Sequence, residues 1–428
     1  MKFLFKNTTT LTESEIESTL KSLEAYHNKI IEVLKSDDYV FSECTLNLPK
    51  DEQVLREVVE MVSQKKTTDL KYVVVIGIGG SNLGTKAVYD ALYGFYEVYE
   101  GNRFPKIIFL DTQDEVALEK CVSLLSKCSK KTEFFINAIS KSGSTTETMV
   151  NLEVLYNSLK NVFGDLNDRM VFTTVSDSKM HLQAEKNNIS TLFMPNMVGG
   201  RYSVFSNVGM FPLALAGMNI KKLRLGAEKL RELFGKNTVD ISNAPAVSAS
   251  VLYLLNKKGF TISDTFTFVP QLESFGKWYR QLMGESIGKN SKGITPTVSS
   301  GSVDLHSVAQ LYLDGPNDKI TTFISLDKPQ NKIKVSEELS FPIIDVIKDR
   351  SVYDVMSAIV NGTKKTYENL KRPFMSIQID NVDEEGLGYL LQFKMIEMMY
   401  LGKLLNVNTF DQPAVELYKV EVKKILGA

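Results

Sequence analysis

The sequence contains few of the side chains that most often bind metals. It has three histidines and three cysteines in 428 residues. Cys44, Cys121 and Cys128 form no Cys-x-x-Cys pair, and an odd number cannot all pair in disulfides. We therefore predict free thiols and no metal site of the Cys/His type. Because free thiols are typical of the reducing cytoplasm, we expect a cytoplasmic protein.

An excess of one charge and long apolar runs are lacking as well. The 50 basic and 51 acidic residues leave a formal net charge of −1, which creates no overall field for nucleic acid or an anionic membrane surface. The short apolar pair within residues 1–6 is not followed by a long apolar stretch, so we predict neither a secretory signal nor a membrane span. Any anion-binding site must therefore be local.

Short, continuous apolar runs alternate with helical patterns in the first half of the chain. Such runs are typical of parallel strands that are buried on both faces. We predict strands at 72–76, 106–110, 134–137 and 170–175, and helices at about 83–93, 115–126, 145–160 and 178–187. Two helices, at 12–35 and 52–65, are expected before them, the first opened by a capping box from Thr12 to Glu15.

A looser alternation of the same kind follows in the second half. Strands are expected at 266–269, 320–324 and 374–379, and helices at 272–283, 383–405 and 412–426. The pattern predicts an α/β protein with mostly parallel sheets flanked by helices. We divide it into an N-terminal helical segment at 1–65, a first α/β domain at 66–235 and a second at 236–428, which includes the C-terminal helices.

Two loops of the first domain are suited to an anion. Residues 77–81 (Gly-Ile-Gly-Gly-Ser) lie between a predicted strand and a predicted helix, where backbone N–H groups and the helix dipole favour phosphate. Asn82 stands where the dinucleotide fingerprint needs its third glycine, and Thr85-Lys86 reverses the order that the Walker A loop needs. A structural tight turn remains an alternative for this segment.

The second loop, residues 140–148 (Ser-Lys-Ser-Gly-Ser-Thr-Thr-Glu-Thr), carries more hydroxyl groups than one helix start can use. Ser142, Ser144 and Thr145 are expected at the helix cap. Together the two loops predict phosphate binding. Arg201, in the glycine turn 199–202, is a candidate for clamping a phosphate or stabilising charge on a reacting oxygen, with a surface arginine as the alternative.

These segments, taken with three later ones, resemble the glucose-6-phosphate isomerase family. The later ones are Gln281-x-x-x-Glu285-Ser-x-Gly-Lys289, the segment around His306, and Phe410-Asp-Gln-Pro-Ala-Val-Glu-Leu-Tyr-Lys419. The matching stretches run from about residue 70 to 420 in the family's order. The resemblance, closest to the compact bacterial branch, implies two sugar-isomerase (SIS-type) domains and a homodimer with sites at the subunit interface.

The resemblance also implies an activity. The family interconverts glucose 6-phosphate and fructose 6-phosphate through a cis-enediol, in glycolysis and gluconeogenesis, without metal or organic cofactor. The expected partner is thus a small phosphosugar, with neither nucleic acid nor membrane. The substrate-binding residues implied are Gly80, Ser81, Ser140, Lys141, Ser142, Thr145, Gln281 and Gln412.

Four catalytic residues follow in the same way. Glu285 is the expected base, because a carboxylate at a helix C-terminus is unfavourable for the dipole and shielding can bring its pKa toward neutrality. His306, assisted by Lys419, would open the sugar ring, and Arg201 would face the enediolate. Gln281 precedes Glu285 by four residues, so that a helix places both on one face.

The sequence departs from the family at two places and leaves alternatives open. Gly301-Ser-Val-Asp-Leu replaces Gly-Thr-Asn-Gly-Gln, and Pro413-Ala414 stands where many members have Trp-Gly. Another phosphosugar such as mannose 6-phosphate is therefore an alternative substrate. A phosphosugar-sensing regulator is a second alternative, and a nicotinamide-dependent dehydrogenase that uses Asp111 is a third.

Overall fold

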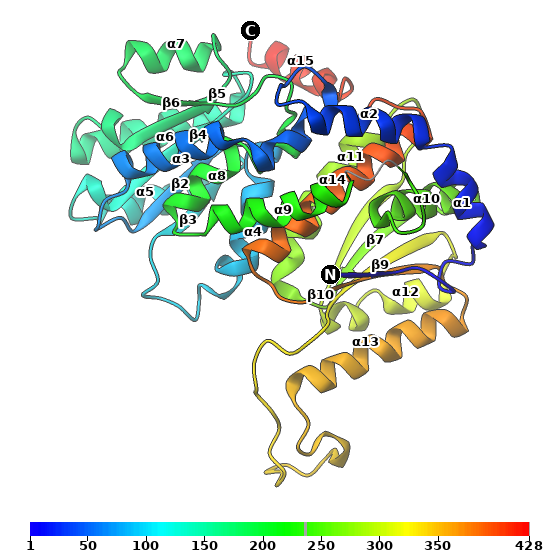
Figure 1. Cartoon of the computed structure of the whole chain (residues 1–428). Coiled ribbons are helices and arrows are strands. Elements are labelled where there is room, and N and C mark those ends of the chain that lie inside the picture. The colour runs from blue at the N-terminus through cyan, green and yellow to red at the C-terminus, as the bar shows by residue number, and fades with distance from the viewer. Residues whose placement is uncertain (235–237, 428) are drawn as a thin grey trace.

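Two five-stranded sheets organise the chain in the computed structural model, which describes residues 1–234 and 238–427 (Figure 1). The first sheet is entirely parallel and has the order β3-β2-β4-β5-β6. Its strands are β2 (Tyr72–Ile76), β3 (Lys106–Leu110), β4 (Phe134–Ile139), β5 (Met170–Thr174) and β6 (Ser190–Phe193). The four predicted strands are confirmed, whereas β6 was not predicted because Ser190 and Thr191 interrupt its apolar character.

Helices cover both faces of this sheet, as the continuous apolar runs require. Val74 and Ile76 of β2 pack with α5 (Glu115–Ser126) and α6 (Thr146–Phe163). The alternate residues Val73 and Val75 belong to the larger core on the opposite face. The remaining helices of this part are α3 (Glu52–Lys65), α4 (Leu83–Leu92), α7 (Lys179–Lys186) and α8 (Asn207–Leu215). Each of the helices predicted between the strands is confirmed.

The second sheet has the order β1-β10-β9-β7-β8. It contains the parallel strands β7 (Ile262–Thr267), β8 (Thr295–Ser300), β9 (Lys319–Leu326) and β10 (Phe374–Ile379). Strand β1 (Lys2–Leu4) pairs antiparallel with β10 at one edge, so the first residues extend this sheet and do not belong to a purely helical segment. The unpredicted β8 lies at the other edge, where its Pro296 is tolerated.

The N-terminal helix predicted at 12–35 is two helices, α1 (Glu13–Lys21) and α2 (Glu24–Lys35). Its predicted capping box is confirmed, because the Thr12 side chain accepts from the Glu15 N–H and the Glu15 side chain accepts from the Thr12 N–H. The chain breaks at Ser22, whose hydroxyl donates to the Thr19 carbonyl. All three cysteines are free thiols, as predicted.

A layer of helices joins the two sheets (Figure 1). It contains α9 (Ile220–Phe234), α10 (Ala244–Lys257), α11 (Glu273–Ile287) and the long, mostly buried α14 (Glu384–Leu405). Helices α9 and α14 approach so closely that a Cβ at Gly388 would overlap the Leu223 carbonyl. The predicted domain boundary between 235 and 236 lies outside the described residues. None of the helices that the structure describes is long and apolar enough to cross a membrane.

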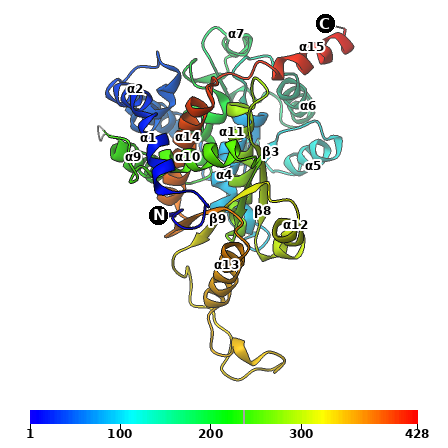
Figure 2. The ribbon, with the colours of Figure 1, turned by 90° about the vertical axis from the view of Figure 1, so that its right-hand side faces the viewer.

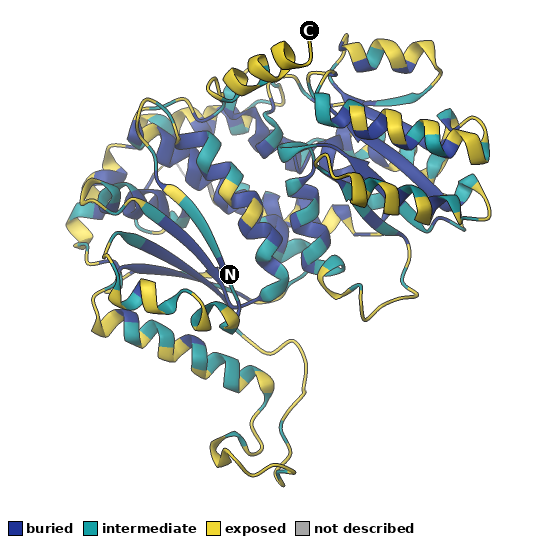
Figure 3. Cartoon of the chain, turned by 180° about the vertical axis from the view of Figure 1, so that it is seen from behind, coloured by how far each residue is buried: buried dark blue, intermediate teal, exposed yellow. Residues whose placement is uncertain are grey.

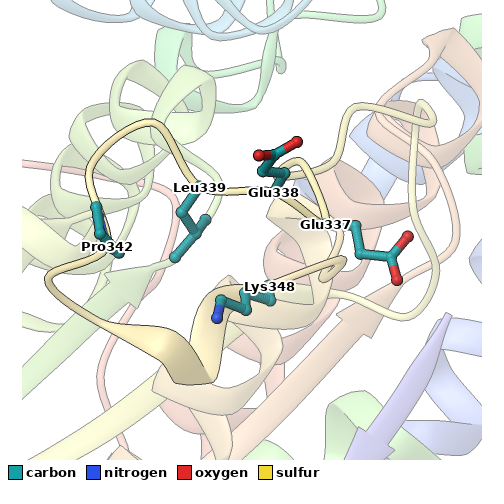
Figure 4. A pocket seen from close by; sticks show the side chains of 5 residues that line it. All are labelled: Glu337, Glu338, Leu339, Pro342 and Lys348. Carbon is teal, nitrogen blue, oxygen red and sulfur yellow. The ribbon is translucent and has the colours of Figure 1, made fainter.

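An arm, residues 328–350, projects from the second sheet between β9 and α13 (Val352–Asn369) (Figure 2). Almost all of its residues are exposed (Figure 3). The Val335 N–H donates to the Arg350 carbonyl at 2.9 Å, and Lys334 pairs with Asp349, so the arm is held by its own contacts. A pocket within it is lined by Glu337, Glu338, Leu339, Pro342 and Lys348, none of which is a predicted site residue (Figure 4).

Candidate active site

The glycine loop after β2 packs against the segment that carries Arg201. Gly79 has a φ of +57° and begins a short 3₁₀ helix, Gly79–Ser81. A Cβ at Gly80 would lie 2.6 Å from the Gly200 Cα and would overlap the Arg201 nitrogen. Backbone therefore lies against backbone, and Gly80 is needed for this contact. Ser81 follows at the surface of the turn, half-buried.

The hydroxyl loop after β4 leaves the start of α6 without a side-chain cap. Ser140 is buried, and its Oγ lies 2.9 Å from the Thr145 Oγ1, while the Ser142 Oγ lies 3.4 Å from the same atom. Thr145 occupies the cap position, but among the described residues no side chain accepts from the first N–H groups of α6, so the predicted capping role is wrong. These N–H groups and hydroxyls lie together, an arrangement suited to a phosphate.

Lys141 connects the hydroxyl loop to the Arg201 segment. Its Nζ donates to the Val198 carbonyl at 3.1 Å, three residues before Arg201. Burial lowers the pKa of Lys141, and the nearby charge of Arg201 lowers it further. The structure thus places a lysine charge, a run of hydroxyls and an arginine charge around one set of loops.

Arg201 is the buried centre of the site, with 2% of its surface exposed. Its Nε donates to the Ser286 Oγ at 2.9 Å. Its Nη1 donates to the Glu285 Oε2 at 3.1 Å and to the Gln412 Oε1 at 2.8 Å. The alternative of a surface arginine is therefore wrong.

The second terminal nitrogen of Arg201 reaches the C-terminal segment. Nη2 donates to the main-chain carbonyls of Thr409 and Asp411. All five N–H donors of the guanidinium are then satisfied, so this one side chain joins the glycine turn, α11 and the loop 409–412.

Glu285 lies inside the last turn of α11, which extends beyond the predicted end at 283 to Ile287. Gln281 Nε2 donates to the Glu285 Oε1 at 3.0 Å, which confirms the expected common face. The Glu285 side chain is 29% exposed. A Cβ at Gly79 would lie 2.9 Å from the Gln281 Nε2, so the glycine loop borders this pair. The carboxylate is oriented by two donors and is still accessible.

Buried contacts fix the rotation of α11. Trp278 Nε1 donates to the Arg201 carbonyl at 3.2 Å. Tyr279 donates to Glu397 of α14, whose carboxylate also pairs with Lys394 at 2.7 Å, with both charged side chains fully buried. A buried pair with its hydrogen bonds satisfied tolerates little movement, so α11 presents Gln281 and Glu285 to the glycine loop in one orientation.

Two of the predicted catalytic residues are not brought together within one chain. His306 is exposed at the end of a short 3₁₀ helix, Ser302–His306, with no hydrogen bond to another described residue. Lys419 lies on α15 (Val415–Ile425) and pairs with Glu416 at 2.7 Å. The helix was predicted to begin at residue 412, but Gln412 precedes it.

Four other contributors to the site had not been assigned a role. Ser286 and Lys289 stand within the predicted motif, next to Glu285, and their position in it was the available signal. Asp411 and Thr409 contribute main-chain carbonyls, for which a sequence gives no residue-specific signal.

Solved structures share the fold of this chain. A hypothetical protein from Thermus thermophilus superposes with a TM-score of 0.85, 26% identity and complete coverage of both chains. A glucose-6-phosphate isomerase from Chlamydia trachomatis gives a TM-score of 0.75 at 20% identity over 94% of this chain and 78% of that one. The fold shared with these structures is an α/β fold with two mostly parallel sheets, as predicted.

Sequence comparison identifies the family within this class. The family model for phosphoglucose isomerase matches residues 25–311, a range that includes Arg201, Glu285 and His306. The glucose-6-phosphate isomerase of Methanocaldococcus jannaschii is 38% identical over 84% of each chain. That of Bacillus cereus is 31% identical over 97% of this chain and 93% of its own. The chain therefore belongs to the phosphoglucose isomerase family. This membership excludes the alternative of a nicotinamide-dependent dehydrogenase.

Proposed function

We propose that this protein is an aldose–ketose isomerase that interconverts glucose 6-phosphate and fructose 6-phosphate in the cytoplasm, in glycolysis and gluconeogenesis. Its family membership and the names of its relatives support this activity. The observation that carries the proposal is the accessible Glu285 carboxylate, held by Arg201 and Gln281 beside two anion-suited loops. We expect the reaction to need neither metal nor organic cofactor.

The substrate is held at its phosphate by the hydroxyl loop. Ser140, Ser142 and Thr145 offer hydroxyls, Lys141 offers charge, and the first N–H groups of α6 offer uncapped donors. A phosphate there is stabilised by charge-assisted hydrogen bonds and by the helix dipole. This anchor leaves the sugar carbons to extend toward Gly80, Ser81 and α11.

Proton transfer between the first two carbons is assigned to Glu285. The carboxylate takes a proton from one carbon and returns it to the next, with a cis-enediol between the two steps. The enediolate carries a negative charge, which the Arg201 guanidinium stabilises. A substrate oxygen can accept from Arg201 only by replacing a present acceptor, and the neutral Gln412 side chain is the one most readily exchanged.

Ring opening is assigned to His306 with Lys419, and a homodimer is proposed to complete this part of the site. His306 is exposed in the single chain, and 43% of the Lys419 side chain is exposed. The helix α15 that carries Lys419 has no buried residue among those described, and it exposes Leu417 and Ile425 (Figure 3). The arm adds Phe341, 80% exposed, and Ile343, 86% exposed. Exposed apolar surface of this kind is typical of subunit interfaces.

Placing aspartate on the arm tests the proposed dimer. We expect F341D/I343D to convert a dimer of about twice 48.0 kDa into monomers, because burying two unpaired carboxylates opposes association. Mass is measured by light scattering after size exclusion. V116D, on the exposed face of α5, is the matched control and should keep the wild-type mass. A monomeric wild type, or a double variant that stays dimeric, contradicts the proposal.

The activity is tested with chelator-treated protein and fructose 6-phosphate, with glucose 6-phosphate detected by a coupled dehydrogenase. Turnover establishes the isomerase and its independence of metal. Parallel assays with mannose 6-phosphate measure substrate preference, which the altered segment at 301–305 leaves open. Binding of the phosphosugars without turnover of either would instead favour a sensor.

A further inference from the structure

Lys289 turns back over the last turn of α11 and is almost fully buried there. Its Nζ donates to the main-chain carbonyls of Glu285 at 2.6 Å and Ser286 at 3.0 Å. The same atom lies 3.4 Å from the Asp411 Oδ1, and 9% of the side chain is exposed. Burial lowers the pKa of Lys289, and the charge of Arg201 lowers it further. The ammonium is thus held at the main chain of Glu285.

The position of Lys289 compensates for the unfavourable position of Glu285 at the C-terminal end of α11. The last carbonyls of a helix have no intrahelical donors and form the negative end of its dipole, where a carboxylate such as Glu285 is disfavoured. Lys289 supplies donors to two of these carbonyls and a positive charge beside them. Its pairing with Asp411 also holds the loop whose main-chain carbonyl accepts from Arg201.

Four titratable or charged groups set the electrostatic environment of Glu285. Arg201 and Lys289 are cationic, Asp411 is anionic, and the buried Tyr202 phenol lies close to Arg201 and Glu285. Removing Lys289 leaves Arg201 as the single cation of this set against two carboxylates and the helix end. A lost positive charge makes a nearby carboxylate easier to protonate.

We propose that Lys289 is a positioning residue of the isomerase, which closes the last turn of α11, balances the negative charge around Glu285 and keeps this base correctly oriented. The inference rests on the proposed role of Glu285 as base. Lys289 acts through the helix end and through Asp411, without touching the substrate.

The chain offers a matched control in Lys292. It lies in the same turn, where its N–H donates to the Lys289 carbonyl at 2.9 Å. Its Nζ donates to the Leu405 carbonyl at the end of α14, also at 2.9 Å. Lys292 therefore makes the same kind of hydrogen bond, but to a carbonyl at the end of a different helix.

The test is the pH dependence of kcat for the full-length enzyme with fructose 6-phosphate. In K289M we expect the acidic limb of the profile of kcat against pH to move to higher pH by roughly 0.5–1 unit, with KM changed less than about twofold. In D411N, which removes a negative charge, the limb should move in the opposite direction. K292M should keep the wild-type limb. The opposite signs of K289M and D411N separate a charge effect from damage to the fold, and D411N serves alone if K289M does not fold.

E285Q in the same series separates the hypothesis that Glu285 is the base from the hypothesis that Lys289 positions it. Inactive E285Q with a shifted K289M limb supports the proposal. Inactive E285Q with unchanged limbs in both K289M and D411N overturns the role of Lys289 and leaves the base assignment intact. E285Q as active as the wild type overturns the base assignment, and the Lys289 proposal with it.

Discussion

Replacing Glu285 with glutamine is expected to lower kcat by about 10²- to 10⁴-fold, the range that a positioned acid–base group contributes. Glutamine keeps the shape of the side chain and an oxygen that accepts from Gln281 or Arg201. It loses the basicity needed to remove a proton from carbon. Since the phosphate is held by the separate hydroxyl loop, binding of fructose 6-phosphate should change less than about threefold.

Two measurements check this result. The coupled assay gives kcat, and calorimetric titration of the variant with fructose 6-phosphate gives Kd. Glu273 provides the control, because it begins the same helix and makes an exposed ion pair with Lys277 at 2.7 Å. E273Q should behave as the wild type. A loss of affinity as large as the loss of rate would reassign Glu285 to binding, and an unchanged kcat would remove it from the chemistry.

The buried parallel strands were predictable because their signal is local. Strand β2 is a continuous apolar run, and β5 begins with three apolar residues before Thr173 and Thr174. Their burial on both faces follows from helices on each side. Strands β1 and β8 lie at sheet edges, where fewer residues are buried and hydroxyl or charged residues are tolerated. Their strand conformation depends on the neighbouring strand, which no local pattern reveals.

The site was predictable where one helix or one loop contains the signal. The spacing of Gln281 and Glu285 is enough to place them on one face, and the structure joins them with a hydrogen bond. The contact between Arg201 and the carbonyls of Thr409 and Asp411 spans about half the chain, and a carbonyl carries no residue identity. Such contacts follow only from the packed fold.

The glycine loop illustrates the limit of an argument from motif alone. Flexible backbone beside a helix start indicated an anion site, with a tight turn as the alternative. The structure adds a mechanical role, because Gly80 lets the loop lie directly against Gly200 and Arg201. Phosphate binding and backbone packing are compatible, since the first uses N–H groups and the second uses the missing side chain.

Replacing Gly80 with alanine should therefore lower both stability and activity. We expect the loss of activity to result from displacement of Arg201. The added Cβ would lie 2.6 Å from the Gly200 Cα and would overlap the Arg201 nitrogen, so backbone must move on both sides. We expect the free energy of unfolding to fall by about 1–3 kcal/mol, as for overpacked cores. The movement should disturb the five hydrogen bonds that Arg201 donates. We expect this to lower kcat/KM by about 100-fold, the effect of misplacing a reacting group by roughly an ångström.

Urea unfolding and the coupled assay measure the two effects separately. G101A is the control, because a Cβ at Gly101 meets no atom within 4 Å. G80A with wild-type activity and stability would show that the two segments can separate without cost, and that the placement of Arg201 depends on α11 and loop 409–412 alone. Lost activity with unchanged stability would instead assign Gly80 to the substrate side of the loop, where its N–H approaches the sugar phosphate. Only a loss of both supports the backbone contact as the feature that places Arg201.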